Sequence, residues 1–216
     1  MKPSLDNLRM ELVNGAKAIF SKGLVDVGEG NVSVRIPKKQ ELLITPTFNL
    51  YETMKKEDVV HLKFDGTQLS KGKRASSEYR LHVAIYKARP KAQCVIHTHS
   101  PYATMLSVAR IKIPILLEEM VVFLGGEVNV SEFGRAHTDE MGEKPLMALS
   151  TTNAVLLANH GVLVCGRTVK HAIKMAELVE KMAKIFWGSS QIGEPVNISK
   201  EASRFKKIFD LNFATY

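Results

Sequence analysis

The stretch Val95-Ile96-His97-Thr98-His99-Ser100 decides how the rest of the chain is arranged. Successive side chains of an extended backbone point to opposite faces, so His97 and His99 project the same way and can reach one metal ion. The apolar residues before the pair are typical of a strand, and Ser100-Pro101 predicts the cap and first residue of a helix. The histidine pair is therefore expected at the end of a strand.

Two further residues complete a candidate metal site. His160 follows the apolar run Ala154 to Ala158 and precedes Gly161, where the backbone can turn sharply. Glu78 offers a carboxylate. Three imidazole nitrogens and one carboxylate oxygen suit zinc and leave the carboxylate exchangeable with substrate. Seven histidines produce some close pairs by chance, but their positions at strand ends favour a metal site over buried core histidines.

The length and composition are typical of a soluble globular protein. The chain has 216 residues, of which 45% are hydrophobic and 24% charged, so we expect a single domain over residues 1–216. The absence of a long apolar run and of a signal-peptide segment argues against a membrane protein and predicts a cytoplasmic location. Cys94 and Cys165 lie in apolar runs and are expected to be buried, reduced thiols.

The formal net charge of +8 raises the question of a nucleic-acid partner. The basic residues are spread through the chain, and their densest clusters lack the interleaved aromatic residues that stack on bases. We therefore expect a solvated basic surface and no nucleic-acid partner. A positive field would also attract a phosphorylated metabolite. The clusters are Lys55-Lys56, Lys71 to Arg74 and Arg204 to Lys207.

Segments upstream of the histidine pair predict an anion-binding site. Gly28 to Asn31 opens one strand and Thr45-Pro46-Thr47 follows its hairpin partner, which brings backbone amides and small polar side chains together. Ser76 and Ser77 can cap a helix, and a helix N-terminus attracts anions. Glu78 is then expected in the first turn of that helix, where the helix dipole would stabilise a carboxylate even without a function.

Other segments carry less specific signals. His82 lies four residues after Glu78 on the same helical face, either as a partner of the site or as a surface residue. The run Met120 to Leu124 is expected to be a strand, and residues 133–137 an irregular loop. Residues 199–216 form a tail with helical spacing that we expect to contact a neighbouring subunit.

Taken together, these segments resemble the class II aldolase/adducin family. The match runs in order through Gly30 to Ser33, Ile44 to Thr47, Ser76 to Glu78, Arg89-Pro90, Val95 to Ser100 and Asn159 to Gly161. The resemblance implies an α/β fold of the α+β type, with a central, mainly antiparallel β-sheet flanked by helices on both sides. It also implies a cyclic homotetramer with active sites between subunits.

The resemblance further assigns roles to residues. Zinc (Zn2+) would be held by His97, His99 and His160, with Glu78 as both ligand and general acid/base. The substrate phosphate would be bound by Asn31, Thr45, Ser76 and Ser77.

The implied reaction is cleavage of a ketose 1-phosphate, such as L-fuculose 1-phosphate, to dihydroxyacetone phosphate and a short aldehyde such as L-lactaldehyde. Zinc acting as a Lewis acid would stabilise the enediolate, and Glu78 would move a proton on its carbon.

The sequence departs from the family pattern at two places. Phe48 follows Thr47 where aldolases of this type have a glycine close to the phosphate. The family's loop tyrosine has no counterpart in residues 131–135, although Tyr216 matches the functional tyrosine of the family's C-terminal tail.

Alternative functions on the same scaffold are methylthioribulose-phosphate dehydratase, sugar-phosphate 4-epimerase and decarboxylase. The epimerases carry aspartate where this chain has Glu78, which favours aldol cleavage. A non-catalytic, adducin-like assembly domain would be expected to lack the metal ligands, and all four are present here.

Overall fold

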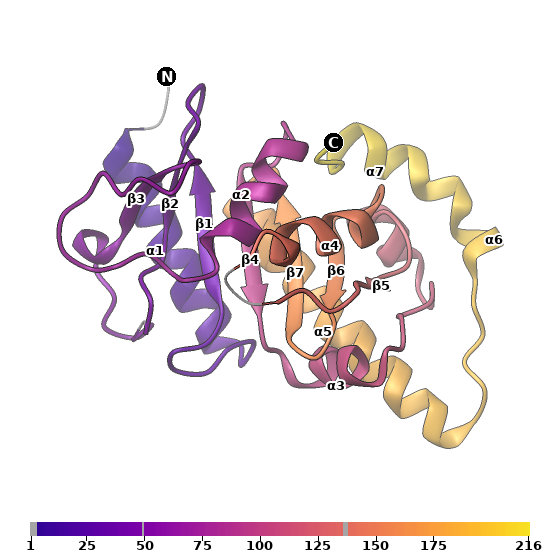
Figure 1. Ribbon diagram of the computed structural model, residues 1–216. Coiled ribbons are helices and arrows are strands. Elements are labelled where there is room, and N and C mark those ends of the chain that lie inside the picture. Colours follow the sequence, from indigo (N-terminus) through magenta and orange to yellow (C-terminus); the bar gives the residue numbers. More distant parts are fainter. Residues whose placement is uncertain (1–3, 49, 136–137) are drawn as a thin grey trace.

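A seven-stranded sheet forms the centre of the fold. The computed structural model describes residues 4–48, 50–135 and 138–216. The strands of the sheet are β1 Asn31–Arg35, β2 Glu41–Ile44, β3 Val60–Lys63, β4 Cys94–Thr98, β5 Asn129–Val130, β6 Ala154–Leu157 and β7 Gly161–Gly166. They lie in the order β3-β2-β1-β4-β7-β6-β5 (Figure 1). Neighbouring strands are antiparallel, except that β5 and β6 are parallel.

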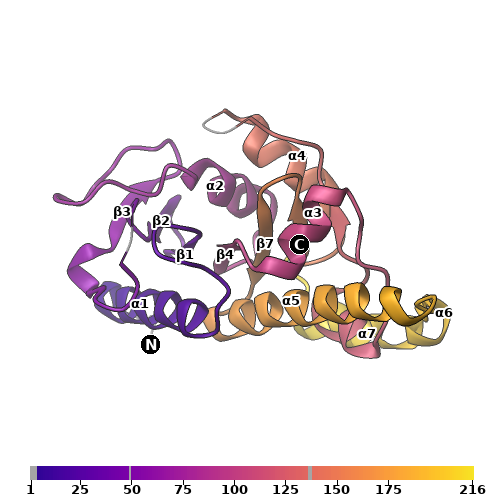
Figure 2. The ribbon, with the colours of Figure 1, turned by 90° about the horizontal axis from the view of Figure 1, so that it is seen from below.

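Helices cover both faces of the sheet (Figure 2). On one face lie α1 (Leu5–Ser21), α3 (Pro101–Ala109) and α5 (Val169–Ile192), and on the other α2 (Tyr79–Ala88) and α4 (Glu140–Leu149). The predicted α/β architecture, a mainly antiparallel sheet between two helical layers, is confirmed. Short helical segments complete the described chain: η1 Lys56–Asp58, η2 Met120–Leu124, α6 Ser199–Ala202, η3 Ser203–Phe205 and α7 Lys206–Asn212.

Strand β4 shows how the sheet is buried on both sides. Cys94 and Ile96 lie in the apolar core between the sheet and helices α1 and α5. Val95 lies in the core on the opposite face, between the sheet and α2. A strand between two helical layers needs apolar side chains on both faces. His97 continues this alternation at the strand end, so its fully buried side chain projects toward the α2 layer.

Strand pairing gathers distant segments at that end of β4. Asn31 of β1 is paired with His97, and Val162 of β7 is paired with Thr98. The turn between β6 and β7, residues 158–160, therefore lies beside the end of β4. The pieces of the candidate site meet there although they are far apart in sequence.

The prediction of a strand over Met120 to Leu124 is wrong, because this run forms the π-helical turn η2. Gly125 ends the turn: its φ is 93° and its N–H donates to the Met120 carbonyl at 3.0 Å. The buried residues Met120, Val121 and Leu124 have helical spacing. A short run of consecutive apolar residues does not distinguish a buried helix from a buried strand.

The C-terminal tail, residues 199–216, packs on its own chain. Phe209 is fully buried against Gly125 beside η2. The Thr215 hydroxyl donates to Asn153 Oδ1 at 2.7 Å, and its carbonyl accepts the Lys91 N–H at 3.1 Å. Contact of this tail with a neighbouring subunit stays a prediction, as does the assignment of residues 1–216 to one domain.

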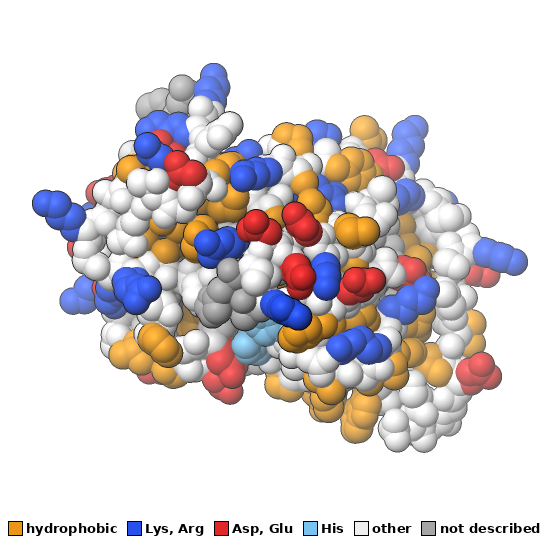
Figure 3. Space-filling view, in the orientation of Figure 1, with side chains coloured by type: hydrophobic (Ala, Val, Ile, Leu, Met, Phe, Trp, Pro, Cys, Tyr) orange, Lys and Arg blue, Asp and Glu red, His pale blue; other side chains and the backbone are white. Residues whose placement is uncertain are grey.

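Charged side chains of both signs are spread over the surface. Figure 3 shows lysine and arginine side chains interspersed with acidic and apolar ones on one face. Among the described residues, no helix combines the length and apolarity that a membrane span needs. Ala136 and His137, expected in an irregular loop, lie outside the described residues.

Candidate active site

Three imidazoles converge at the end of β4. His97 and His99 come from the strand end, and His160 comes from the turn between β6 and β7. Their ligand nitrogens all lie within 4.8 Å of one another, and the Nε2 atoms of His97 and His99 are 2.9 Å apart. His99 and His160 are partly exposed, so the cluster opens to solvent.

The backbone of the β6–β7 turn allows this approach. Asn159 has a φ of 52°, a left-handed conformation that asparagine tolerates better than most residues. At Gly161, a Cβ atom would collide with the Thr98 carbonyl and lie 3.2 Å from His97 Cε1. Glycine at this position therefore lets β7 lie close enough to β4 for the rings to meet.

Glu78 brings a carboxylate into contact with two of these rings. It occupies the N-cap position of α2, one residue before the expected first turn. Its Oε1 is 3.1 Å from His160 Nε2, its Oε2 is 3.5 Å from His97 Nε2, and Asn31 donates Nδ2–H to Oε2 at 2.6 Å. Burial opposes ionisation, but hydrogen bonds donated by His160 and by the Asn31 amide outweigh it and hold the pKa of Glu78 well below its usual range.

The protonation state of His97 fits a bound cation. Its Nδ1–H donates to the Val162 carbonyl at 2.8 Å, so its Nε2 carries a lone pair that faces His99 and Glu78. Burial lowers the pKa of His97 to about 3, which keeps the ring neutral at neutral pH. Three converging imidazoles beside a carboxylate match the donor set of a catalytic metal site with one exchangeable position.

The buried histidines should make the metal-free protein sensitive to acid. Burial lowers the pKa of His97 to about 3 and that of His82 to about 4, from about 6.5 in the unfolded chain. Between these values the unfolded chain binds more protons than the folded chain, so stability falls as the pH falls. From pH 7 to pH 5 we expect the free energy of unfolding to drop by roughly 2 kcal/mol for each histidine.

Urea unfolding of chelator-treated protein at pH 7, 6 and 5 measures this dependence. A free energy of unfolding that stays constant over this range would show that the two rings are not buried in the neutral form.

A cavity of about 220 Å³ opens beside Glu78 and the imidazoles. Within the described ranges its lining includes no lysine or arginine, so an anion in it would be bound by hydroxyl and amide groups and by a cation held on the imidazoles. The lining residues are Gly28, Glu29, Gly30, Asn31, Pro46, Thr47, Phe48, Ser76, Ser77, Glu78 and His99.

Three of the four predicted phosphate-binding residues line this cavity, namely Asn31, Ser76 and Ser77. Thr45 lies behind the wall instead. It is fully buried, its hydroxyl accepts a backbone N–H of β1 at 3.3 Å, and its carbonyl accepts the Ser76 N–H at 3.1 Å. Thr47, two residues further on, faces the cavity. Thr45 therefore lies behind the cavity wall, and Thr47 is the threonine that lines the cavity.

Phe48 stands at the rim of the cavity. Its side chain is 86% exposed, so the ring projects into solvent and does not fill the cavity. Its φ of 52° lies in the left-handed region that favours glycine. The backbone thus has a conformation that favours glycine although a bulky residue occupies the position.

Tyr216 lies at the other end of the sheet from the imidazoles of its own chain. Its hydroxyl donates to the Asp210 carboxylate at 2.5 Å, and its ring lies 5.6 Å from the Arg89 guanidinium. The preceding Thr215 contacts Cys165 near the end of β7, whereas the imidazoles lie at the start of that strand. The structure does not bring Tyr216 into the site of its own chain.

Two residues near the site were not resolved by sequence reasoning. Glu29 Oε2 lies 3.7 Å from His99 Nδ1, in the segment Gly28 to Asn31 that was expected to open a strand. His82, left between a partner of the site and a surface residue, is fully buried. The sequence signal for Glu29 was a carboxylate between two glycines. The signal for His82 was its spacing of four residues from Glu78.

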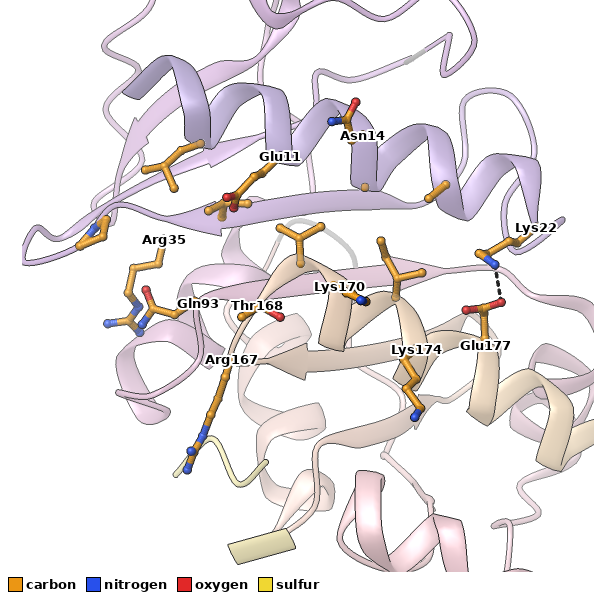
Figure 4. A pocket seen from close by; sticks show the side chains of 17 residues that line it. Glu11, Asn14, Lys22, Arg35, Gln93, Arg167, Thr168, Lys170, Lys174 and Glu177 are labelled. Atoms are coloured by element: carbon orange, nitrogen blue, oxygen red, sulfur yellow. Dashed lines mark hydrogen bonds and ion pairs between the residues drawn. The ribbon is translucent and has the colours of Figure 1, made fainter. Parts of the chain in front are cut away.

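The largest cavity lies elsewhere, as a groove of about 820 Å³ between α1 and α5. Figure 4 shows apolar side chains on its walls and an ion pair between Lys22 and Glu177, 2.6 Å apart, across one end. Among the described residues, the group that could hold a metal is the imidazole cluster, which is not in this groove. The smaller cavity is therefore the candidate active site.

The sheet with helices on both faces, and the three imidazoles beside a cavity that contains hydroxyl and amide groups, are the features of a metal-dependent enzyme of the α/β class. The chain belongs to the family described as the class II aldolase and adducin N-terminal domain, whose sequence pattern matches residues 10–187. The family predicted from the sequence is thereby confirmed, and its relatives that are named as aldolases are aldehyde-lyases.

Individual relatives span most of the chain. This protein is 35% identical to the 5-methylthioribulose-1-phosphate/5-deoxyribulose-1-phosphate aldolase of Rhodospirillum rubrum over 189 residues. The matched region covers 87% of this chain and 84% of the relative. The protein is 30% identical to the L-fuculose phosphate aldolase of Escherichia coli K12, over 89% of this chain and 88% of the relative. A solved structure of L-fuculose 1-phosphate aldolase is similar with a TM-score of 0.90 and 30% identity, covering 97% of this chain and 98% of that one.

Proposed function

We propose that this protein is a zinc-dependent aldolase that cleaves a ketose 1-phosphate to dihydroxyacetone phosphate and a short aldehyde. One observation carries the proposal: the three imidazoles and the Glu78 carboxylate meet at the mouth of a cavity lined by hydroxyl and amide groups. A metal and an anion site side by side are what a phosphorylated, metal-chelating substrate requires. The names of the relatives support the same reaction class.

His97, His99 and His160 would hold the zinc ion. When bound, the ion supplies Lewis-acid polarisation of substrate oxygens. The hydrogen bond from His97 to the Val162 carbonyl keeps the ligand nitrogen unprotonated and the ring in place. The imidazoles therefore form a ready donor set.

Glu78 would move the proton. Its pKa is held low, so it is a carboxylate when substrate arrives, and its contacts with His97 and His160 place it at the metal position. Displaced from that position by substrate, it can return a proton to the carbon left when the carbon–carbon bond breaks, and remove it in the reverse direction. Asn31, Ser76 and Ser77 would bind the phosphate, with Thr47 beside them.

The names of the relatives point to deoxy sugars as substrates. L-Fuculose, 5-deoxyribulose and 5-methylthioribulose all end in an apolar group, a methyl or a methylthio, and their 1-phosphates all release dihydroxyacetone phosphate on aldol cleavage. We assign this class of deoxyketose 1-phosphates to the protein, with L-lactaldehyde or another short aldehyde as the second product.

A coupled assay with a panel of these three ketose 1-phosphates tests the proposal. We expect release of dihydroxyacetone phosphate that is lost with a chelator and restored by zinc. A 3-oxo-tetronate 4-phosphate decarboxylase of Escherichia coli is also a relative, at 29% identity. Release of carbon dioxide from such an acid, without cleavage of any ketose phosphate, would contradict the aldolase assignment.

We propose further that the enzyme is a cytoplasmic homotetramer with active sites shared between subunits. Because Tyr216 lies away from the imidazoles of its own chain, it can act in catalysis only at the site of a neighbouring subunit. Sedimentation measures the assembly. A fully active monomer would contradict the shared site.

Phe48→Gly should relieve strain at the cavity rim. Phenylalanine in the left-handed conformation costs about 1–2 kcal/mol, and the exposed ring contributes little packing. We expect stability equal to or higher than that of the parent. The Michaelis constant for ketose 1-phosphate should fall by up to about tenfold, the worth of one hydrogen bond to a charged group from the freed backbone.

Thermal unfolding and steady-state kinetics measure these effects, with Leu50→Ala as an exposed apolar control in the same segment. A higher Michaelis constant in the glycine variant would show that the Phe48 ring contacts the substrate.

A further inference from the structure

Five polar side chains form a continuous hydrogen-bonded chain behind the metal site. Residues two apart on a strand share a face, as do residues four apart on a helix. Asn31 and Ser33 of β1 therefore alternate along the chain with side chains of α2 and its N-cap residue. Apart from Glu78, every member is at most 2% exposed. In spatial order the chain is Tyr86, Ser33, His82, Asn31 and Glu78.

The chemistry of the groups fixes the direction of every hydrogen bond. A carboxylate only accepts, so the Asn31 atom 2.6 Å from Glu78 is the NH2 nitrogen. The Asn31 carbonyl oxygen then faces His82 Nε2, which must carry the hydrogen. Burial keeps His82 neutral, so its Nδ1 accepts from the Ser33 hydroxyl at 2.7 Å. Ser33 in turn accepts from the Tyr86 hydroxyl at 2.8 Å.

The Asn31 amide is the point at which this chain meets the site. Its NH2 group donates both to Glu78 Oε2 and to Ser76 Oγ, 3.0 Å away, at the edge of the anion cavity. A flipped amide would direct its carbonyl oxygen at the carboxylate, and like partial charges would repel. His82 reinforces the same orientation, because its Nε2–H donates to the amide carbonyl oxygen.

We propose that His82 is a positioning residue: its Nε2–H holds the Asn31 amide with the NH2 group toward Glu78 and Ser76, and so fixes the carboxylate that moves the proton. The kinetic part of this inference rests on the proposed aldolase function, whereas the arrangement of the amide does not. Apolar side chains of the same size would fill this space without desolvating polar groups. Packing alone therefore does not explain the five hydrogen-bonded side chains.

The first test reads the ring directly on the unaltered, metal-free protein. Long-range proton–nitrogen correlation spectra of histidine-labelled protein at pH 7 distinguish the two neutral tautomers and the imidazolium. We expect His82 as the neutral ring with hydrogen on Nε2, assigned by the signal missing from His82→Gln. Hydrogen on Nδ1, or a charged ring, would overturn the proposal whether or not the enzyme is an aldolase.

The second test compares variants under turnover. His82→Gln keeps an N–H donor toward Asn31 and an acceptor toward Ser33, whereas His82→Leu removes both. We expect kcat to fall roughly 10- to 100-fold in the leucine variant, with a smaller change in KM, and the glutamine variant to retain most of the rate. Tyr86→Phe breaks a buried hydrogen bond at the far end of the chain and is the matched control for lost stability.

Several outcomes decide between positioning and structure. Equal activity in the leucine and glutamine variants, or an equal loss of kcat in Tyr86→Phe, would reduce His82 to a structural residue. A parent that turns over no ketose phosphate would refute the proposed function, and the tautomer would then decide on His82 alone. If His82→Leu does not fold, the tautomer and the glutamine variant still test the inference.

Discussion

His97→Ala should lose its bound metal and at least roughly 10³-fold in kcat/KM. Two imidazoles and a carboxylate remain, but the lost ligand is the fully buried one whose nitrogen faces both His99 and Glu78. Lewis-acid catalysis is worth several kcal/mol, and each 1.4 kcal/mol is a factor of ten in rate. Metal analysis after dialysis, together with steady-state kinetics, measures both effects.

His61→Ala is the matched control, because it also removes an imidazole from a strand. His61 lies on β3, three strands from β4, and contacts Glu41 at 2.8 Å. We expect this variant to keep its metal and its rate. Full metal content and turnover in His97→Ala would remove His97 from the ligand set.

Glu78→Gln should fold, bind metal and lose roughly 10²- to 10⁴-fold in kcat, the range of a general acid/base. The amide keeps the shape of the carboxylate but does not accept and return the proton. The three imidazoles do not change, so metal content should stay close to that of the parent. The variant therefore separates proton transfer from metal binding.

Glu127→Gln provides the control for loss of a carboxylate. Glu127 forms an ion pair with Lys112 at 2.9 Å, away from the imidazoles, and its replacement should leave the rate unchanged. Near-normal turnover in Glu78→Gln would assign the proton transfer to another group.

Local patterns predicted that the candidate histidine ligands lie at strand ends, and the family resemblance predicted the fold. The alternation of β4 side chains between the two faces of the sheet and the two-residue spacing of His97 and His99 are consequences of strand geometry. The turn after an apolar run brings His160 beside them. The order of strands that brings these pieces together was not predicted from the sequence and is seen only in the structure. Local pattern gives the parts of the site, and strand register decides which parts meet.

Other features depend on tertiary contacts that a local pattern does not record. Thr45 and Thr47 are both small, polar and on the same face of an extended segment, yet pairing with β1 buries the Thr45 hydroxyl and leaves Thr47 at the cavity. The η2 turn is decided by Gly125 and by Phe209 of the tail. His82 had a recognisable spacing, but its burial depends on the facing residue Ser33.

Hydrogen exchange into dihydroxyacetone phosphate tests the central claim most directly, because it isolates proton transfer at the metal site from the choice of aldehyde. Zinc-loaded protein is incubated with dihydroxyacetone phosphate in heavy water without aldehyde, and the hydroxymethyl protons are followed by NMR. We expect one of the two prochiral hydrogens to exchange, and this exchange to stop with a chelator or in Glu78→Gln. No exchange by the zinc-loaded protein, or exchange that a chelator does not affect, would contradict a metal-assisted aldolase with Glu78 as its base.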